Sequence, residues 1–202
     1  MSPTDPDTRA RREDWETRYR EGRTHWDRGA PSPALMEWLN QGLVPGKRVL
    51  VPGCGHGHEI LELARRGFQV TAVDIASQPI ESLRTRLTKE ELEAEIIQGD
   101  LLHIHFQTPF DAIYEQTVIC ALDPSCWRDY TSRLHAWLRP RGTLFALFMQ
   151  TGRDGGPPFH CPLERMRELF PEERWLWLSE APRRVPHPSG LEELGFILRR
   201  KD

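Results

Sequence analysis

The chain has 202 residues and a formal net charge of −3, so its length suits one domain and its charge offers no basic surplus for nucleic acid. No segment approaches the ~20 consecutive apolar residues of a membrane span, and the four cysteines form no C-x-x-C pair. These features predict a cytoplasmic domain that binds neither nucleic acid nor a membrane and has no disulfide framework or zinc knuckle.

The predicted domain begins at Trp15. Residues 1–14 are polar and are predicted to form a flexible tail, whereas residues 15–202 are predicted to form the single domain. Trp15 and Trp26 stand in otherwise polar surroundings, where an aromatic face must find a partner. Ordinary helix packing is an equal alternative for Trp15, whereas Trp26 lies in a predicted loop and favours a ligand.

An apolar strand that runs into three alternating glycines follows next. The strand is predicted over Arg48–Val51, and a helix with one apolar face is predicted from about Gly57 to Arg66. Glycines at such a turn let the backbone approach a ligand closely. The three glycines are Gly53, Gly55 and Gly57.

A second strand, Gln69–Val73, ends in Asp74, which can accept hydrogen bonds from both hydroxyls of a ribose. The glycine spacing distinguishes two cofactor classes. A dinucleotide site requires G-x-G-x-x-G, but the third glycine position falls on His58 or Ile60, so the spacing is G-x-G-x-G. This spacing suits S-adenosylmethionine, which has no phosphate to hold and carries a sulfonium that attracts aromatic rings.

Strands and helices continue to alternate towards the C-terminus. Asp100 follows the third strand and therefore lies at the same sheet edge as Asp74, where binding is favoured over a plain surface turn. The last two strands, separated by a proline-rich turn, are predicted to form an antiparallel hairpin. The predicted helices are Ser77–Leu87, Ser125–Leu138 and Leu163–Phe170, and the strands are Ala94–Gln98, Phe110–Tyr114, Gly142–Met149, Arg174–Ser179 and Leu194–Arg199.

The pattern predicts an α/β fold with a doubly wound, mostly parallel sheet of seven strands, helices on both faces and an antiparallel last strand. The ligand of such a sheet lies across the carboxyl ends of its strands. Gly53, Asp74 and Asp100 all fall at that edge.

Several ordered motifs from Trp15 to the C-terminus resemble the thiopurine S-methyltransferase family, which includes the thiol and halide methyltransferases called harmless-to-ozone-layer proteins. The resemblance implies a Rossmann-like class I methyltransferase fold, S-adenosylmethionine as cofactor, S-adenosylhomocysteine as product, and a monomer. The motifs are Trp15-x-x-x-Tyr19-x-x-Gly22-x-Thr24-x-Trp26-Asp27-x-Gly29, Val51-Pro52-Gly53-Cys54-Gly55-x-Gly57-His58, Phe110-Asp111-x-Ile113-Tyr114, Cys120-Ala121-x-x-Pro124, Gly155-Gly156-Pro157-Pro158-Phe159, Pro186 and Leu191-Glu192-Glu193-Leu194-Gly195.

The resemblance also implies a role for individual residues. Aromatic side chains line the cofactor, the glycine loop contacts it, Asp74 binds the ribose, and Asp100 with Leu101 lies beside the adenine. The implied cofactor residues are Trp15, Tyr19, Trp26, Gly53, Gly55, Asp74, Asp100, Leu101 and Gln116.

No catalytic residue is assigned, but five side chains are candidates for the acceptor pocket. Three positions depart from the family pattern: Glu115 replaces an aspartate, Gln116 replaces a tyrosine or arginine, and Phe159 replaces the tyrosine of plant relatives. The missing hydroxyl makes thiol transfer a better expectation than halide transfer. The pocket candidates are Tyr19, His25, Gln116, Phe159 and His160.

The histidine pairs 56/58 and 103/105 suggest a second hypothesis, in which a metal site supports methyl transfer to a catechol-like acceptor. No third ligand is spaced to complete such a site, so no metal is expected and these histidines are predicted to be exposed or hydrogen-bonded.

The predicted reaction is methyl transfer from S-adenosylmethionine to a small sulfur nucleophile. Because a thiol is partly ionised near neutral pH and intrinsically nucleophilic, no general base is obligatory. Three alternatives remain: a nitrogen or oxygen acceptor, a nicotinamide-dependent dehydrogenase, and a module that binds the cofactor without turnover.

Overall fold

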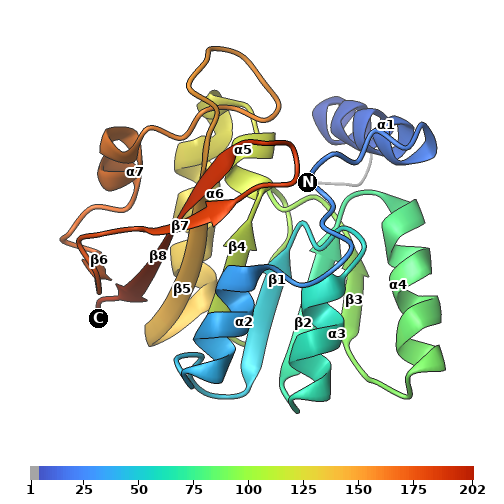
Figure 1. The fold of residues 1–202 in the computed structure, drawn as a ribbon, viewed down its shortest axis with the longest axis horizontal. Coiled ribbons are helices and arrows are strands. Elements are labelled where there is room, and N and C mark those ends of the chain that lie inside the picture. The colour runs from blue at the N-terminus through green and yellow to red at the C-terminus, as the bar shows by residue number, and fades with distance from the viewer. Residues whose placement is uncertain (1–4) are drawn as a thin grey trace.

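The computed structural model describes residues 5–202, which form a central sheet with helices on both faces (Figure 1). Within these residues eight strands are arranged in the order β3-β2-β1-β4-β5-β8-β6, with β7 also paired to β8. Strands β1 to β5 are parallel and β8 is antiparallel to β5, so the predicted fold class is confirmed. The strands are β1 (Arg48–Pro52), β2 (Gln69–Asp74), β3 (Glu95–Gln98), β4 (Phe110–Gln116), β5 (Leu138–Gln150), β6 (Trp175–Trp177), β7 (Arg183–Pro186) and β8 (Glu192–Arg200).

The sheet edge beyond β8 differs from the seven-stranded prediction. Strand β7 pairs with residues 192–195 of β8, and β6 pairs with residues 198–200. Two short strands therefore share one edge of β8, which explains the additional strand. The sequence pattern missed β7 because only Val185 of its four residues is buried, too little for an alternating signal.

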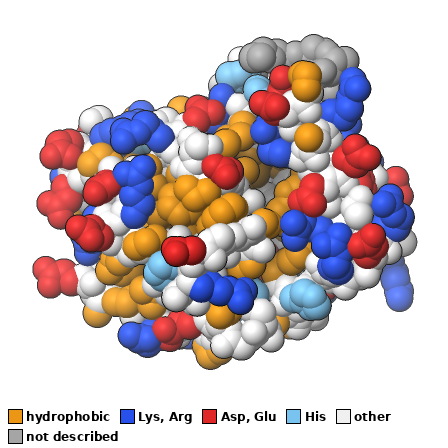
Figure 2. Space-filling view, turned by 90° about the horizontal axis from the view of Figure 1, so that it is seen from above, with side chains coloured by type: hydrophobic (Ala, Val, Ile, Leu, Met, Phe, Trp, Pro, Cys, Tyr) orange, Lys and Arg blue, Asp and Glu red, His pale blue; other side chains and the backbone are white. Residues whose placement is uncertain are grey.

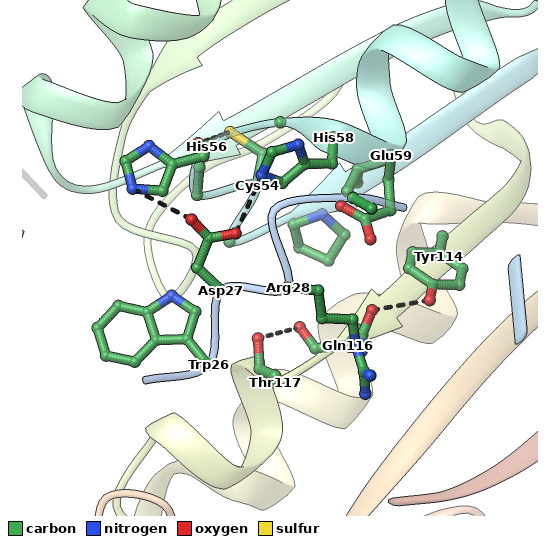
Figure 3. Close-up of a pocket in the computed structure, with 16 residues that line it drawn as sticks. Trp26, Asp27, Arg28, Cys54, His56, His58, Glu59, Tyr114, Gln116 and Thr117 are labelled. Carbon is green, nitrogen blue, oxygen red and sulfur yellow. Dashed lines mark hydrogen bonds and ion pairs between the residues drawn. The ribbon is translucent and has the colours of Figure 1, made fainter. Parts of the chain in front are cut away.

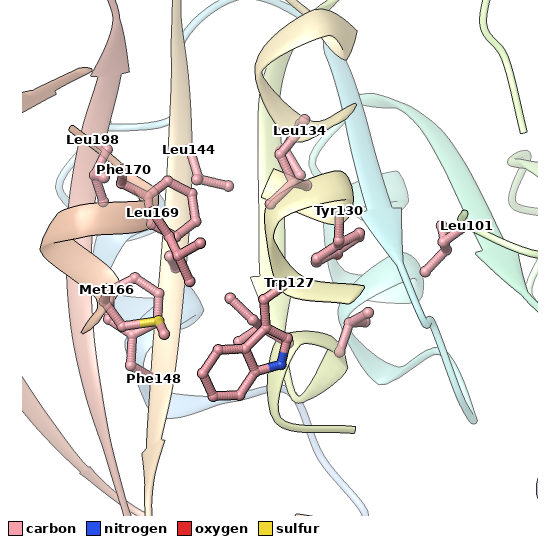
Figure 4. Packing of buried hydrophobic residues seen from close by; sticks show 14 of the residues in the cluster. Leu101, Trp127, Tyr130, Leu134, Leu144, Phe148, Met166, Leu169, Phe170 and Leu198 are labelled. Atoms are coloured by element: carbon pink, nitrogen blue, oxygen red, sulfur yellow. The ribbon is translucent and has the colours of Figure 1, made fainter. Parts of the chain in front are cut away.

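Two hydrophobic clusters hold the helices against the sheet. Alternate strand residues face opposite sides, so Leu50 joins the cluster that includes α6 and α7, while Val49 and Val51 join the one that includes α2, α3 and α4. The buried face of α6 carries Trp127, Tyr130, Leu134 and Trp137, and Figure 4 shows part of its packing. The helices are α1 (Pro6–Arg20), α2 (Pro33–Asn40), α3 (His58–Arg65), α4 (Ser77–Lys89), α5 (Val118–Ala121), a 3₁₀ turn η1 (Pro124–Cys126), α6 (Trp127–Trp137) and α7 (Leu163–Leu169).

Helix α1 begins at Pro6, inside the predicted tail. Residues 6–14 are therefore helical, and residues 1–4 lie outside the described part. Asp5 caps the helix by accepting a hydrogen bond from the backbone N–H of Thr8 at 3.2 Å, and Pro6 suits its first turn. The helix is polar and lies above the carboxyl edge of the sheet (Figure 1). Contacts with the rest of the domain stabilise it there. In residues 5–202 no helix is long and apolar enough to cross a membrane.

The strand order reverses between β1 and β4. From β1 the chain proceeds outward through β2 and β3, whereas β4 leads to β5 on the other side. The loops that leave β1 and β4 therefore separate, which opens a crevice at the carboxyl ends of these strands. Gly53 follows β1 and Thr117 follows β4, so both lie at this crevice.

Candidate functional site

A cavity of about 540 Å³ opens at the carboxyl edge of the sheet and is called here the larger cavity, because a smaller one of about 60 Å³ adjoins it. This volume lies within the range of small-molecule sites, roughly 300 to 1,000 Å³. Seen from above (Figure 2), hydrophobic side chains occupy the middle of this face and charged side chains surround them. The residues that line the cavity fall into a roof from residues 11–26, a β1–β3 half from residues 53, 74–75 and 99–101, and a β4–β8 half from residues 117–122, 149–158 and 187–191.

The glycine loop is built for close approach. Gly53, Gly55 and Gly57 have φ values of 57°, 51° and 74°, in the left-handed region that side chains disfavour. An added Cβ would collide with Val118 at Gly53 and with Leu83 at Gly57. These three positions therefore favour glycine, as the spacing predicts.

Asp74 lies at the end of β2 with only 7 % of its surface exposed. Its Oδ2 accepts a hydrogen bond from the backbone N–H of Gly55 at 2.9 Å, and its Oδ1 accepts one from Ala76 at 3.0 Å. Burial raises the pKa of Asp74, while these N–H groups oppose the shift. Each carboxylate oxygen keeps a lone pair for a ligand hydroxyl.

The roof contains all three aromatic residues implied for the cofactor. Trp26 makes edge-to-face contacts with Trp15, at 5.4 Å between ring centroids, and with Tyr19, at 5.7 Å. All three line the larger cavity together with His25. The predicted aromatic wall is therefore assembled, from α1 and the loop after it.

Asp100 and Leu101 line the β1–β3 half, but the Asp100 carboxylate already has several partners. Its Oδ2 accepts hydrogen bonds from Arg11 Nη2 at 2.6 Å and Thr8 Oγ1 at 2.8 Å, and His103 Nδ1 lies 3.1 Å away. Burial alone would raise the pKa of Asp100, but the hydrogen bond from Arg11 and others lower it to about 2. Asp100 therefore fastens α1 to the sheet edge, a role absent from the sequence analysis.

A smaller cavity of about 60 Å³ adjoins the glycine loop and is lined by Gly55 and Gln116 (Figure 3). The Gln116 amide accepts a hydrogen bond from Tyr114 Oη at 2.8 Å and donates one to Glu193 Oε2 at 2.9 Å. Arg28 Nη2 lies 3.0 Å from the same Glu193 oxygen. Gln116 thus belongs to a buried polar network next to the larger cavity and does not line that cavity.

His56 and His58, which flank Gly57, pair with Asp27 of the N-terminal loop (Figure 3). Their Nε2 atoms lie 3.8 and 3.0 Å from the two Asp27 carboxylate oxygens. His58 is therefore hydrogen-bonded, as predicted, and ties the loop after α1 to the glycine loop, whereas His56 lies too far from Asp27 for a hydrogen bond.

Two acceptor-pocket candidates, Phe159 and His160, line neither cavity. Phe159 packs against the hydrophobic cluster around α6, and His160 Nδ1 accepts hydrogen bonds from the backbone N–H groups of Thr151 and Gly152. Both side chains hold the loop after β5, whose Pro157 and Pro158 reach the cavity instead.

Glu115, a departure from the family pattern, is buried at the end of β4. Its Oε1 accepts hydrogen bonds from the backbone N–H groups of Val118 and Ile119 at 3.1 and 2.9 Å, which caps α5. Burial raises the pKa of Glu115 to about 8. This carboxyl shapes the floor of the β4–β8 half without lining it.

The β4–β8 half also contains residues that the sequence analysis missed. Cys120, Met149 and Leu191 give it a largely apolar surface, and Arg153 and His187 are its basic groups. None of the described residues that line this half is an aspartate or glutamate. Cys120 and Leu191 belong to motifs of the family resemblance but received no role there, whereas Met149, Arg153 and His187 lie only near such motifs.

The sequence profile described as Thiopurine S-methyltransferase (TPMT) matches residues 10–181. The chain belongs to this family. It is 30 % identical to the probable thiol methyltransferase 2 of Arabidopsis thaliana over 159 residues, covering 77 % of this chain and 70 % of that protein. It is 26 % identical to thiocyanate methyltransferase 1 of Brassica oleracea, covering 90 % and 82 %, and 29 % identical to the thiopurine S-methyltransferase of Pseudomonas entomophila (strain L48), covering 77 % and 81 %.

Solved structures show the same fold. The 1,6-didemethyltoxoflavin-N1-methyltransferase of Burkholderia thailandensis, solved with S-adenosylhomocysteine, superposes with a TM-score of 0.78 at 23 % identity, covering 100 % of this chain and 92 % of that one. The magnesium protoporphyrin IX methyltransferase of Synechocystis PCC 6803, solved with S-adenosylmethionine, has a TM-score of 0.76 at 14 % identity and covers both chains completely. The predicted family and fold are confirmed, and the chain is an S-adenosylmethionine-dependent S-methyltransferase of small molecules.

Proposed function

We propose that this methyltransferase acts on a small sulfur nucleophile of the thiol, sulfide, thiocyanate or thiopurine type. The β4–β8 half of the larger cavity supports this proposal, because it is largely apolar, carries the cationic Arg153 and has no carboxylate among its described lining residues. A soft anion fits such a surface. The names of the plant and bacterial relatives agree with this acceptor class.

The β1–β3 half fits the cofactor. Gly53 lines the cavity in a left-handed conformation where an added Cβ would collide with Val118, and the Asp74 carboxylate nearby has free lone pairs. We assign Gly53 and Gly55 to backbone contact, Asp74 to the ribose and Leu101 to the adenine. When bound, S-adenosylmethionine supplies a methyl group on a positively charged sulfonium.

The residues of this chain then have three tasks. Trp15, Tyr19 and Trp26 enclose the site, hold the sulfonium by their ring faces and exclude water. With S-adenosylmethionine bound, an ionised acceptor sulfur would take the methyl group and leave S-adenosylhomocysteine, so no residue of this chain would need to remove a proton. Because opposite charges neutralise each other in this step, an apolar surrounding favours it.

A nitrogen acceptor, an alternative that the sequence left open, fits this cavity less well. A protonated amine would need a carboxylate as partner or base, yet Asp100 is paired with Arg11 and Asp74 faces the ribose position. This arrangement favours a sulfur acceptor. A module without turnover would bind the cofactor and transfer to no acceptor.

Calorimetry with S-adenosylmethionine and S-adenosylhomocysteine tests the proposal, with NADH as the control ligand. The wild type, Asp74→Ala and the exposed-site control Asp129→Ala should be compared, followed by methyl transfer to hydrosulfide, 2-mercaptoethanol, thiophenol, thiocyanate and an amine panel. We expect binding that only Asp74→Ala weakens, and transfer to a sulfur acceptor. Transfer to amines alone would contradict the acceptor class, and tight binding of NADH alone would contradict the cofactor.

A further inference from the structure

Arg153 lies in the loop after β5 and lines the larger cavity on its β4–β8 half. Thr151 Oγ1 holds both backbone polar groups of this residue: it accepts a hydrogen bond from the Arg153 N–H at 3.3 Å and donates one to the Arg153 carbonyl at 3.1 Å. Thr151 itself does not line the cavity. Because Arg153 is exposed, its guanidinium is the polar group that a molecule in the cavity can contact.

The other arginines of this cavity already have a carboxylate partner. Four arginines line the cavity in all, and in the described part of the chain the guanidinium of Arg153 has no ion-pair partner. Its charge is therefore available to a ligand, whereas the charges of the other three are paired. The pairs are Arg11–Asp100, Arg18–Asp14 and Arg23–Glu21, with N–O distances of 2.6, 2.9 and 2.7 Å.

The β4–β8 half changes from apolar to cationic between its inner and outer parts. Cys120 and Met149 are buried, with 3 % and 1 % of their surface exposed, whereas Arg153 is exposed. Methyl transfer takes place inside the cavity, where water is excluded. A thiol that presents its sulfur there directs its other end towards the rim, where Arg153 lies.

The charge at this rim determines which outer end of a thiol is favoured. No aspartate or glutamate is among the described residues that line this half, so no carboxylate there compensates Arg153. A guanidinium offers parallel N–H donors that match the two oxygens of a carboxylate. An ammonium group at the same position would be repelled by the like charge. The rim therefore favours an anionic outer end over a neutral one, and a neutral one over a cationic one.

We propose that the preferred acceptor is a small thiol with a carboxylate at the end away from its sulfur, and that Arg153 selects it by binding this carboxylate. The proposal rests on the proposed S-methyl transfer and narrows its acceptor class. The charge of the carboxylate does not change while the methyl group transfers, so Arg153 acts on acceptor binding and hardly on the chemical step. Hydrosulfide has no second group and experiences only the long-range attraction of Arg153.

The test uses three thiols that share the frame HS–CH₂–CH₂ and end in a carboxylate, a hydroxyl or an ammonium group: 3-mercaptopropionate, 2-mercaptoethanol and cysteamine. KM and kcat are measured for the wild type, Arg153→Gln and Arg153→Glu. The matched control is Arg128→Gln, on an exposed residue of α6 that lines neither cavity. The three thiols differ in acidity, so each variant is compared with the wild type on the same thiol, and this difference cancels.

Calorimetry gives a second measure that does not depend on turnover. It determines the affinity of each protein for S-adenosylhomocysteine, and then the affinity of the resulting complex for the methylated product 3-(methylthio)propionate. The cofactor affinity should stay within about twofold in all variants, since the substitutions lie outside the β1–β3 half. Only the Arg153 variants should bind 3-(methylthio)propionate more weakly.

In Arg153→Gln we expect the KM for 3-mercaptopropionate to rise about 5- to 20-fold, as for a charge-assisted hydrogen bond weakened by exposure to solvent, with kcat changed by less than about threefold. The KM for 2-mercaptoethanol should stay within about twofold. Arg153→Glu should reverse the order, so that cysteamine gains and 3-mercaptopropionate loses further. Arg128→Gln should match the wild type on all three thiols.

Three results would overturn the inference: an unchanged KM for 3-mercaptopropionate in Arg153→Gln, an equal change for all three thiols, or a loss confined to kcat. In each case the proposed S-methyl transfer stands, because the wild type still methylates thiols. If the wild type binds S-adenosylhomocysteine yet methylates none of the three thiols, the proposed acceptor class fails, and the role of Arg153 fails with it.

Discussion

The two halves of the larger cavity are built in different ways. In the β1–β3 half, glycines and a strand-terminal carboxylate fix the geometry, and the backbone itself supplies the key contacts at Gly55 and Ala76. In the β4–β8 half, side chains from three separate turns meet over a hydrophobic base. The two constructions suit different ligands. The β1–β3 half suits a cofactor of fixed structure, whereas the β4–β8 half can accommodate a different acceptor when a few loop side chains change.

The largest effect is expected from Asp74→Ala. Loss of two hydrogen bonds between a carboxylate and ribose hydroxyls should weaken S-adenosylhomocysteine binding about 100- to 1,000-fold.

In Leu191→Ala, in the β4–β8 half, cofactor affinity should stay nearly constant while the acceptor KM rises. Calorimetry measures the cofactor affinity of Asp74→Ala and Leu191→Ala, and initial rates measure the acceptor KM. If both variants lost cofactor affinity equally, the two halves would not differ in function.

Glu115, beneath the β4–β8 half, should make the stability of the chain depend on pH. Burial raises the pKa of Glu115 to about 8 in the folded chain, above its ordinary value of 4.5. The unfolded chain releases this proton first, so the contribution of Glu115 to stability is fully present below about pH 4.5 and is lost as the pH rises towards 8. Glu115→Gln keeps an oxygen for the N–H groups of α5 and should be more stable than the wild type by about 2 kcal/mol at pH 8.

Chemical denaturation of Glu115→Gln and the wild type at pH 5 and pH 8 measures this difference. It should nearly vanish at pH 5. A constant difference at both pH values would mean that the carboxyl ionises normally in the folded chain.

A smaller effect is expected at the ion pair of Arg11 and Asp100, which fastens the roof to the β1–β3 half. The pKa of Asp100 is lowered to about 2, so the pair contributes its stability above the ordinary range near 4 and loses it as the pH falls through about 2. Arg11→Met should cost about 1 to 2 kcal/mol of unfolding free energy at pH 7, after allowance for solvent screening of the partly exposed guanidinium.

Denaturant titration of Arg11→Met at pH 7 and pH 2 checks this expectation, with Arg128→Met, on an exposed side chain, as control. The penalty should shrink at pH 2. An Arg11→Met protein with wild-type stability and wild-type cofactor affinity would show that α1 is held by its aromatic contacts alone.

The smallest effect is expected from Arg153→Gln at the exposed rim of the β4–β8 half. Long-range attraction of an anionic acceptor should fall by about two- to threefold in kcat/KM, and the difference should disappear at high salt. Initial rates with hydrosulfide at low and high ionic strength provide the measurement. A salt-independent difference would indicate direct contact between Arg153 and the acceptor.

Sequence reasoning succeeds where local rules dominate. Apolar periodicity predicts the βα units, and the glycine spacing with Asp74 predicts the β1–β3 half, because strand, turn and helix are neighbours in the chain. Helix α1 escapes prediction because it is polar and depends on distant partners such as Asp100. Likewise, no local pattern distinguishes His187, which reaches the cavity, from His160, which holds its own loop. These placements depend on how turns pack together, which the sequence of each turn does not encode.

The hydrogen bonds between Asp74 and the backbone have a consequence for the entropy of binding. The N–H groups of Gly55 and Ala76 hold the carboxylate in one orientation through protein contacts alone. Immobilising a freely rotating side chain on binding costs about 0.5 to 1.5 kcal/mol. In this protein that rotational freedom is already lost on folding, so the ribose contact requires little further ordering of the carboxylate.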